Sequence, residues 1–155
     1  MSLISYPIIK SFSPYIYVSK SIFQALHTGI SSTLSIIRIL NKNSNLLGIE
    51  PFNNFLIKSD LLVKLEIFDL LLIDLNNKKL LNSILACLDK ISTLIKKIKK
   101  SLEEINVKIN NHCNKYLYYY RNLDLNNELI CLENDSLLLN TRIDLLLKLL
   151  KVNFN

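Results

Sequence analysis

A row of apolar residues with heptad spacing runs through residues 81–119 and constrains the fold more than any other feature of the sequence. Positions a and d are apolar over about five heptads, the pattern of a long helix that packs against other helices. We call this row the seam, and we expect it to be the interface with partner helices. Its members are Leu81, Ile84, Leu88, Ile91, Ile95, Ile98, Leu102, Ile105, Ile109, His112, Tyr116 and Tyr119.

Residues 52–155 contain neither glycine nor proline, because the two glycines and three prolines of the chain all lie at or before Pro51. Sheets and tight turns normally need these residues, so a stretch of this length without them favours helix. Half of the 155 residues are hydrophobic, which is enough to bury one core. The sequence therefore predicts an all-α fold, a helical bundle with one long heptad-repeat helix at about residues 78–121.

The two halves of the seam differ in the width of their apolar face. Up to about Leu94 the neighbouring e and g positions are also apolar, whereas later they are mainly lysine, serine and asparagine. A wide apolar face is typical of a helix inside a multi-helix bundle, and a narrow one of a coiled coil. We expect the first half to stabilise this chain's own fold, and the second half to project as a coiled coil that meets something else.

The other segments give the domain organisation. Pro7 and Pro14 favour an irregular segment over residues 1–21, followed by a single all-helical domain over residues 22–155. Polar, asparagine-rich breaks separate the expected helices, which lie at about residues 22–41, 54–75, 78–121, 124–132 and 136–152. The last of these is apolar nearly all round, which requires burial in its own bundle or against a partner.

The charge distribution makes nucleic acid an unexpected partner. The formal net charge is +6, but residues 50–155 carry 15 basic and 13 acidic residues and are nearly balanced. A nucleic-acid footprint needs a concentrated basic surface. The densest basic run, a weak basic patch, is interpreted as the solvated back of a helix, with a nuclear import signal or phosphate contacts as alternatives. It consists of Lys96, Lys97, Lys99 and Lys100.

Residues 22–40 have an amphipathic pattern in a part of the chain that carries no acidic residue before Glu50. The simplest interpretation is an amphipathic helix on the domain surface. One alternative is a mitochondrial targeting segment, and another is a basic anchor that makes peripheral contact with a membrane surface. The uncharged window between Lys20 and Arg38 has only 17 residues and many serines and threonines, too short and too polar for a membrane span.

Composition also indicates the setting of the protein. Cys87, Cys113 and Cys131 are widely spaced and form no CxxC pair, which favours a reducing intracellular compartment. Lysine outnumbers arginine sixteen to three, and asparagine, isoleucine and tyrosine are abundant. These residues have A/T-rich codons, so we infer an A/T-rich genome.

Candidate chemistry is sparse. The run YLYYYR at residues 116–121 could stack on bases, but packing at a core or interface is favoured. His112 beside Cys113 lacks a second ligand pair for zinc, and a calcium-loop pattern starting at Asp124 lacks the required glycine. We therefore expect no catalytic residue, no metal site, no cofactor and no enzyme activity.

These features together predict a structural or adaptor protein that assembles through a coiled-coil helix as one subunit of a larger complex. The sequence leaves open whether the oligomer is formed with copies of itself or with other chains. A membrane-surface or organelle-targeted protein that uses the helix at residues 22–40 is the alternative. A ligand-binding or enzymatic helical bundle ranks last.

Overall fold

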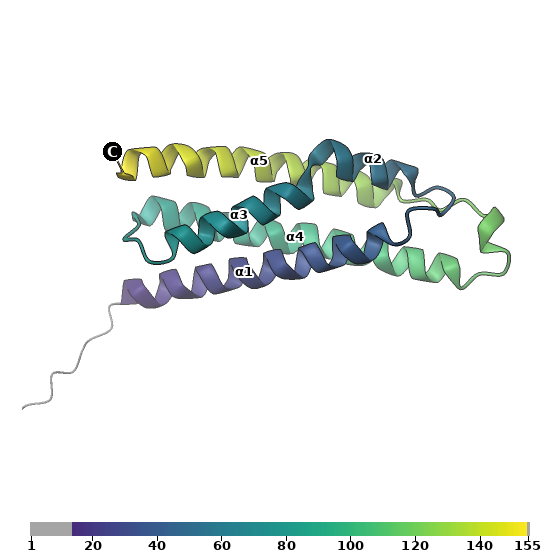
Figure 1. Cartoon of the computed structure of the whole chain (residues 1–155), viewed down its shortest axis with the longest axis horizontal. Helices are drawn as coiled ribbons and strands as arrows, with labels where there is room; N and C mark the ends of the chain where they lie inside the picture. The colour runs from purple at the N-terminus through teal and green to yellow at the C-terminus, as the bar shows by residue number, and fades with distance from the viewer. Residues whose placement is uncertain (1–13, 155) are drawn as a thin grey trace, which may run out of the picture.

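Five α-helices and one short 3₁₀ helix build the molecule in the computed structural model, which describes the backbone of residues 14–154 and the side chains of residues 18–154 (Figure 1). The predicted all-α helical bundle is confirmed, and the described range contains no β-strand. The elements are α1 (Pro14–Asn41), α2 (Glu50–Ser59), α3 (Leu61–Leu75), α4 (Asn82–Cys113), η1 (Tyr118–Tyr120) and α5 (Asn126–Phe154).

The helices lie roughly along one axis, with α4 packed against both α1 and α5 (Figure 1). The α2–α3 segment lies across α1 and α5 on the side away from α4. There α2 contacts α5, and α3 contacts α1. Its two helices are separated by Asp60, which has φ 51° and ψ 33°. Aspartate tolerates this left-handed conformation better than most residues, so it can redirect the chain without a glycine.

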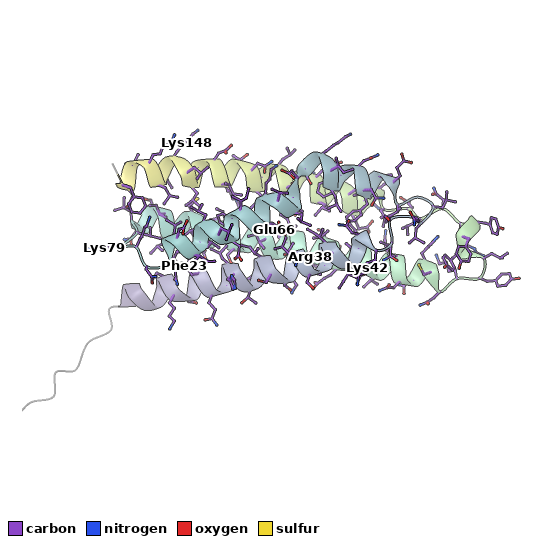
Figure 2. All side chains as sticks on the ribbon, viewed as in Figure 1. Phe23, Arg38, Lys42, Glu66, Lys79 and Lys148 are labelled. Carbon is purple, nitrogen blue, oxygen red and sulfur yellow. The ribbon has the colours of Figure 1, made fainter. Side chains whose placement is uncertain are left out.

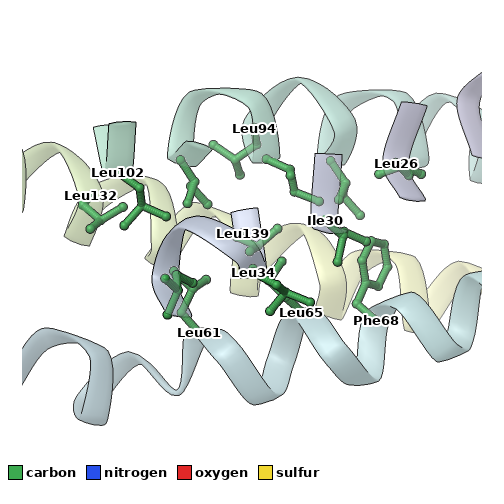
Figure 3. Close-up of a cluster of buried hydrophobic side chains, with 14 of the residues drawn as sticks. Leu26, Ile30, Leu34, Leu61, Leu65, Phe68, Leu94, Leu102, Leu132 and Leu139 are labelled. Atoms are coloured by element: carbon green, nitrogen blue, oxygen red, sulfur yellow. The ribbon is translucent and has the colours of Figure 1, made fainter. Parts of the chain in front are cut away.

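The seam forms the centre of the core. Nine of its twelve residues, from Ile84 to His112, are buried inside this chain. Leu94 and Leu102 of α4 meet side chains from α1, α3 and α5 in one cluster, which includes Ile30, Leu65 and Leu139 (Figure 3). Removal of this apolar surface from water is the main force that holds the bundle together.

The prediction that the second half of the seam projects is wrong. Ile98, Leu102 and Ile105 are fully buried, because α1 and α5 extend alongside the second half of α4 as well as the first. The apolar face is narrow there, but Ser101 beside it is also buried. A small serine lets neighbouring helices approach closely, which compensates for the missing aliphatic side chain.

Several predicted boundaries are wrong. The long helix spans Asn82–Cys113 rather than residues 78–121, and α1 begins at Pro14 rather than residue 22, because proline is well tolerated in the first turn of a helix. Of the segment expected to be irregular, residues 14–21 are helical, and residues 1–13 lie outside the described residues. The helix expected at residues 54–75 starts earlier, at Glu50, and is divided at Asp60.

The two helices expected at residues 124–132 and 136–152 are a single helix, α5. The polar residues between them remain helical because Leu132, Ser136 and Leu139 form one continuous buried row across that point. Ser136 is therefore part of the core. The helix start is stabilised by Asp124, whose carboxylate accepts a hydrogen bond from the Asn126 amide at 3.0 Å.

Candidate interaction surfaces

The predicted interface lies mostly inside the molecule. Nine seam residues contact helices of the same chain and are not accessible to a partner in this structure. The three exposed members are Leu81, which directly precedes α4, and Tyr116 and Tyr119, which follow its end. Other apolar side chains are on the surface, and they define two rows and one cluster.

The first surface is the outer row of α3, which we define as Val63, Ile67 and Leu70. All three are exposed, and their spacing of four and three residues places them on one stripe of the helix. The opposite stripe, with Leu65 and Phe68, is buried in the core. α3 is thus apolar on two faces, of which its own bundle covers one.

Two polar side-chain contacts link the flank of α3 to α1. The Arg38 guanidinium contacts the Glu66 carboxylate at 3.0 Å (Figure 2), and His27 Nδ1 lies 2.8 Å from the Asp69 carboxylate. Both pairs are largely exposed, so each contributes little to stability. α3 thus has polar contacts toward α1 and aliphatic side chains toward solvent.

The second surface is the outer row of α5, which we define as Leu138, Leu145 and Val152. These exposed residues recur every seven positions, on the side away from buried Leu139 and Leu146. The sequence predicted that this nearly all-apolar helix is buried in its own bundle or against a partner. The bundle buries only one of its faces. Burial of the other face against a partner stays a prediction.

The basic run lies on the outer surface of α4. Lys96 and Lys97 are exposed, whereas Lys99 and Lys100 lie 3.5 Å and 3.9 Å from Glu103 and Glu104. These contacts are one helical turn apart along the same helix and neutralise half of the run. This placement fits the interpretation as a solvated helix back.

The third surface is the tyrosine tip, which we define as Tyr116, Leu117, Tyr119 and Tyr120. α4 ends at Cys113, so the expected continuation of the helical seam to Tyr116 and Tyr119 is wrong, as is their packing in the core; their packing at an interface stays a prediction. Their side chains are 82% and 71% exposed, and that of Tyr120 is 82% exposed. Leu117, with φ 56°, reverses the chain just before η1. The tip lies at one end of the bundle (Figure 1).

Tyr118 supports the tip from inside. Its ring stacks on Tyr119 with centroids 3.9 Å apart and meets His112 edge-on at 6.4 Å. The hydrogen bond between the Tyr118 and Tyr119 side chains is the main cause that raises the pKa of Tyr118 to about 12. Sequence reasoning missed this arrangement because nothing in the local pattern marks Leu117 as left-handed.

The amphipathic face at residues 22–40 is also used internally. Leu26, Ile30 and Ile37 are completely buried against the rest of the bundle. The apolar face that a membrane-surface anchor needs is therefore covered in this structure. Within residues 14–154, no helix is both long enough and apolar enough to cross a membrane.

Several charged groups outside these surfaces contact neighbouring helices. Glu128 contacts the Lys108 ammonium at 2.6 Å, and the Arg142 guanidinium donates to the Lys90 carbonyl at 2.6 Å. Burial raises the pKa of the Cys87 thiol, an effect that the charge of Arg142 partly opposes. Among the described residues, no three histidine, cysteine or acidic side chains converge as metal ligands.

Open grooves complete the surface. One of about 550 Å³ lies between α1 and α3, lined by residues that include Phe23, His27 and Leu72. A second, of about 390 Å³, lies between the loop before α2 and the tyrosine tip and includes Tyr118 and Tyr119.

Comparison of the chain with protein-family models, curated proteins and solved structures finds no match to any of them.

Proposed function

We propose that this protein is a non-enzymatic structural or adaptor subunit that joins a larger assembly through contacts between its helices and helices of partner proteins. The observation that carries the proposal is the outer row of α3, a helical stripe of exposed aliphatic residues. Such a stripe is the usual complement of a partner helix, which would cover it at adjacent i, i+3 and i+4 positions. The proposed compartment is intracellular and reducing, in keeping with three free cysteines.

The proposed site of contact differs from the one that the sequence suggested. The seam is occupied by α1 and α5, so a partner that used it would have to displace part of the core. The outer rows of α3 and α5 need no such opening. Because water contact with aliphatic side chains is unfavourable, covering these rows would stabilise an assembly without changing the bundle.

The test uses affinity purification of the tagged chain from its native source, with mass spectrometry of the proteins that accompany it. The test variant is Val63→Ser, Ile67→Ser and Leu70→Ser together. We expect wild type to retain at least one specific protein in stoichiometric amount, and the triple variant to lose it. Light scattering of the purified chain distinguishes a second copy from a different protein as the partner.

The control replaces three aliphatic residues on the other row, Leu138, Leu145 and Val152, with serine. If both triple variants keep the same partners as wild type, helix docking through these rows is wrong. If only the α5 variant loses the partner, the contact lies on α5, and the assignment to α3 is wrong. Circular dichroism spectra must agree among the three proteins, because loss of folding would also remove partners.

A further inference from the structure

The tyrosine tip concentrates large apolar side chains at one end of the molecule (Figure 1). Single exposed hydrophobic residues are common on soluble proteins, but four within five consecutive positions form a patch. Leu47 adds to it, since it is exposed and its carbonyl accepts a hydrogen bond from the Leu123 amide at 3.1 Å. The patch therefore joins two loops at the same end of the bundle.

The backbone holds this patch in place. The amides of Tyr120 and Arg121 donate to the carbonyls of Leu117 and Tyr118, both at 3.1 Å, and close the 3₁₀ turn. Leu117 adopts the left-handed conformation, which is unfavourable for a leucine and persists only where surrounding contacts enforce it. The exposure of the three tyrosines is thus a property of a defined turn rather than of a loose loop.

The charged residues that directly flank the tip in the sequence are basic. Lys115 and Arg121 flank the patch, and the sequence between Glu104 and Asp124 contains no acidic residue. Lys42 lies at the start of the adjoining loop, at the same end of the bundle (Figure 2). Two carboxylates also lie near the tip. Glu50, in the first turn of α2, lines the groove that contains Tyr119, and Asp124 accepts a hydrogen bond from the Asn126 amide.

We propose that the tyrosine tip inserts into the interfacial layer of an anionic phospholipid membrane. Tyrosine is favoured at the membrane–water interface, where its ring meets apolar lipid and its hydroxyl stays hydrated. Lysine and arginine beside it are attracted to anionic headgroups. A protein that stacks single-stranded bases normally tracks the strand along an extended basic groove, whereas this patch lies at one end of the bundle (Figure 1).

This contact is independent of the partner rows on α3 and α5. The tip lies at the end of the long axis of the bundle, so insertion of its side chains would stand the helices upright on the membrane (Figure 1). The sides of the bundle, including both outer rows, would then face the aqueous phase. A membrane-bound molecule could still meet partner helices.

The test is flotation of the full-length chain with vesicles of phosphatidylcholine alone and with a 30% share of phosphatidylserine. We expect wild type to float with the anionic vesicles and to be released by high salt, because charge attraction is screened. Replacement of Tyr116, Tyr119 and Tyr120 with serine should abolish flotation. Lys115→Gln with Arg121→Gln should weaken partitioning, by about fivefold for each charge removed.

The control variant carries serine at Leu138, Leu145 and Val152, which removes an equal number of exposed hydrophobic residues from a side of the bundle, and it should float like wild type. The proposal is overturned if wild type stays in solution at every phosphatidylserine content, or if the tyrosine variant floats as wild type does. Binding of a fluorescent single-stranded oligonucleotide without vesicle binding would also overturn it. The glutamine variant keeps the test decisive if the tyrosine variant does not fold.

Discussion

The two glycines lie in different backbone environments, Gly48 in a loop with positive φ and Gly29 inside α1. Replacing each with alanine tests backbone strain at the first and helix propensity at the second. Gly48 has φ 88°, and a Cβ there would collide with the backbone of Leu123 and the side chain of Asn122. Gly48→Ala should therefore lower the free energy of unfolding by about 1–3 kcal/mol, as strained left-handed residues do. Urea unfolding followed by circular dichroism measures the change.

Gly29→Ala is the matched control for this prediction. Gly29 lies inside α1, where its added Cβ would be 3.3 Å from the Ile95 side chain. The gain in helix propensity, about 1 kcal/mol, offsets the cost of this tight contact. Equal destabilisation by the two substitutions would contradict the turn geometry at Gly48.

The three cysteines should differ in their reactivity toward thiol reagents. Cys131 is exposed, Cys113 is half-buried and Cys87 is buried with a raised pKa, so the thiolate is scarcest and least accessible at Cys87. We expect alkylation of the native protein in the order Cys131, Cys113, Cys87, measured by peptide mass spectrometry. Rapid labelling of Cys87 before unfolding would show that α4 and α5 do not pack as described.

Sequence spacing predicted which apolar residues of α4 pack together on one face of the helix. It did not predict conformations that depend on single backbone angles. The spacing correctly marked Ile84, Leu88 and Ile98 as one packed stripe. Asp60 and Leu117, however, adopt positive φ without being glycine, so no residue type signalled the junction before α3 or the turn of the tyrosine tip. The exposure of Tyr116 followed from that missed turn.

At the scale of a helix, α4 offers a direct comparison between its two faces. Ile98 is fully buried, and Ile98→Ala should lower the free energy of unfolding by about 2–5 kcal/mol, since it removes contacts and leaves a cavity. Val107 lies on the exposed side of the same helix, and Val107→Ala should change stability by about 0.5 kcal/mol or less. Urea unfolding of both variants measures these differences.

This comparison decides between the structure and the interpretation of the second half as a projecting coiled coil. In a projecting helix, Ile98 would be exposed in the monomer, and its truncation would change self-association rather than monomer stability. A small effect of Ile98→Ala on unfolding, together with a loss of oligomer, would contradict the bundle described above.

Helix boundaries were harder to predict than the existence of helices. Breaks expected at residues 76–77 and 122–123 do interrupt the helices, but the interruptions are longer than predicted and extend over residues 76–81 and 114–125, with the short helix η1 inside the second. The segment at residues 133–135 is equally polar but stays helical, because Leu132 and Leu139 face the same neighbours across it. Tertiary packing overrode a local break signal there, and such an effect depends on contacts that a linear pattern does not contain.

At the scale of the whole molecule, stability should be greatest where helices meet on two sides. α4 packs against α1 along one side and α5 along another, whereas η1 lies at the end of the bundle. Hydrogen exchange should therefore be slowest for amides in the middle of α4 and fastest in η1 and the loops beside it. Uniform exchange rates along α4 and η1 would mean that the bundle opens as one unit.

The antiparallel arrangement places the start of α1 and the end of α5 at the same end of the bundle, opposite the tyrosine tip (Figure 1). The 32 residues of α4 span about 48 Å, which sets the scale of the separation between these ends. A label attached near the start of α1 or near the end of α5 would thus lie roughly one bilayer thickness, about 40 Å or more, from the tyrosines. Energy transfer between a dye near the start of α1 or the end of α5 and a labelled vesicle surface would measure how far that end of the bundle lies from the membrane.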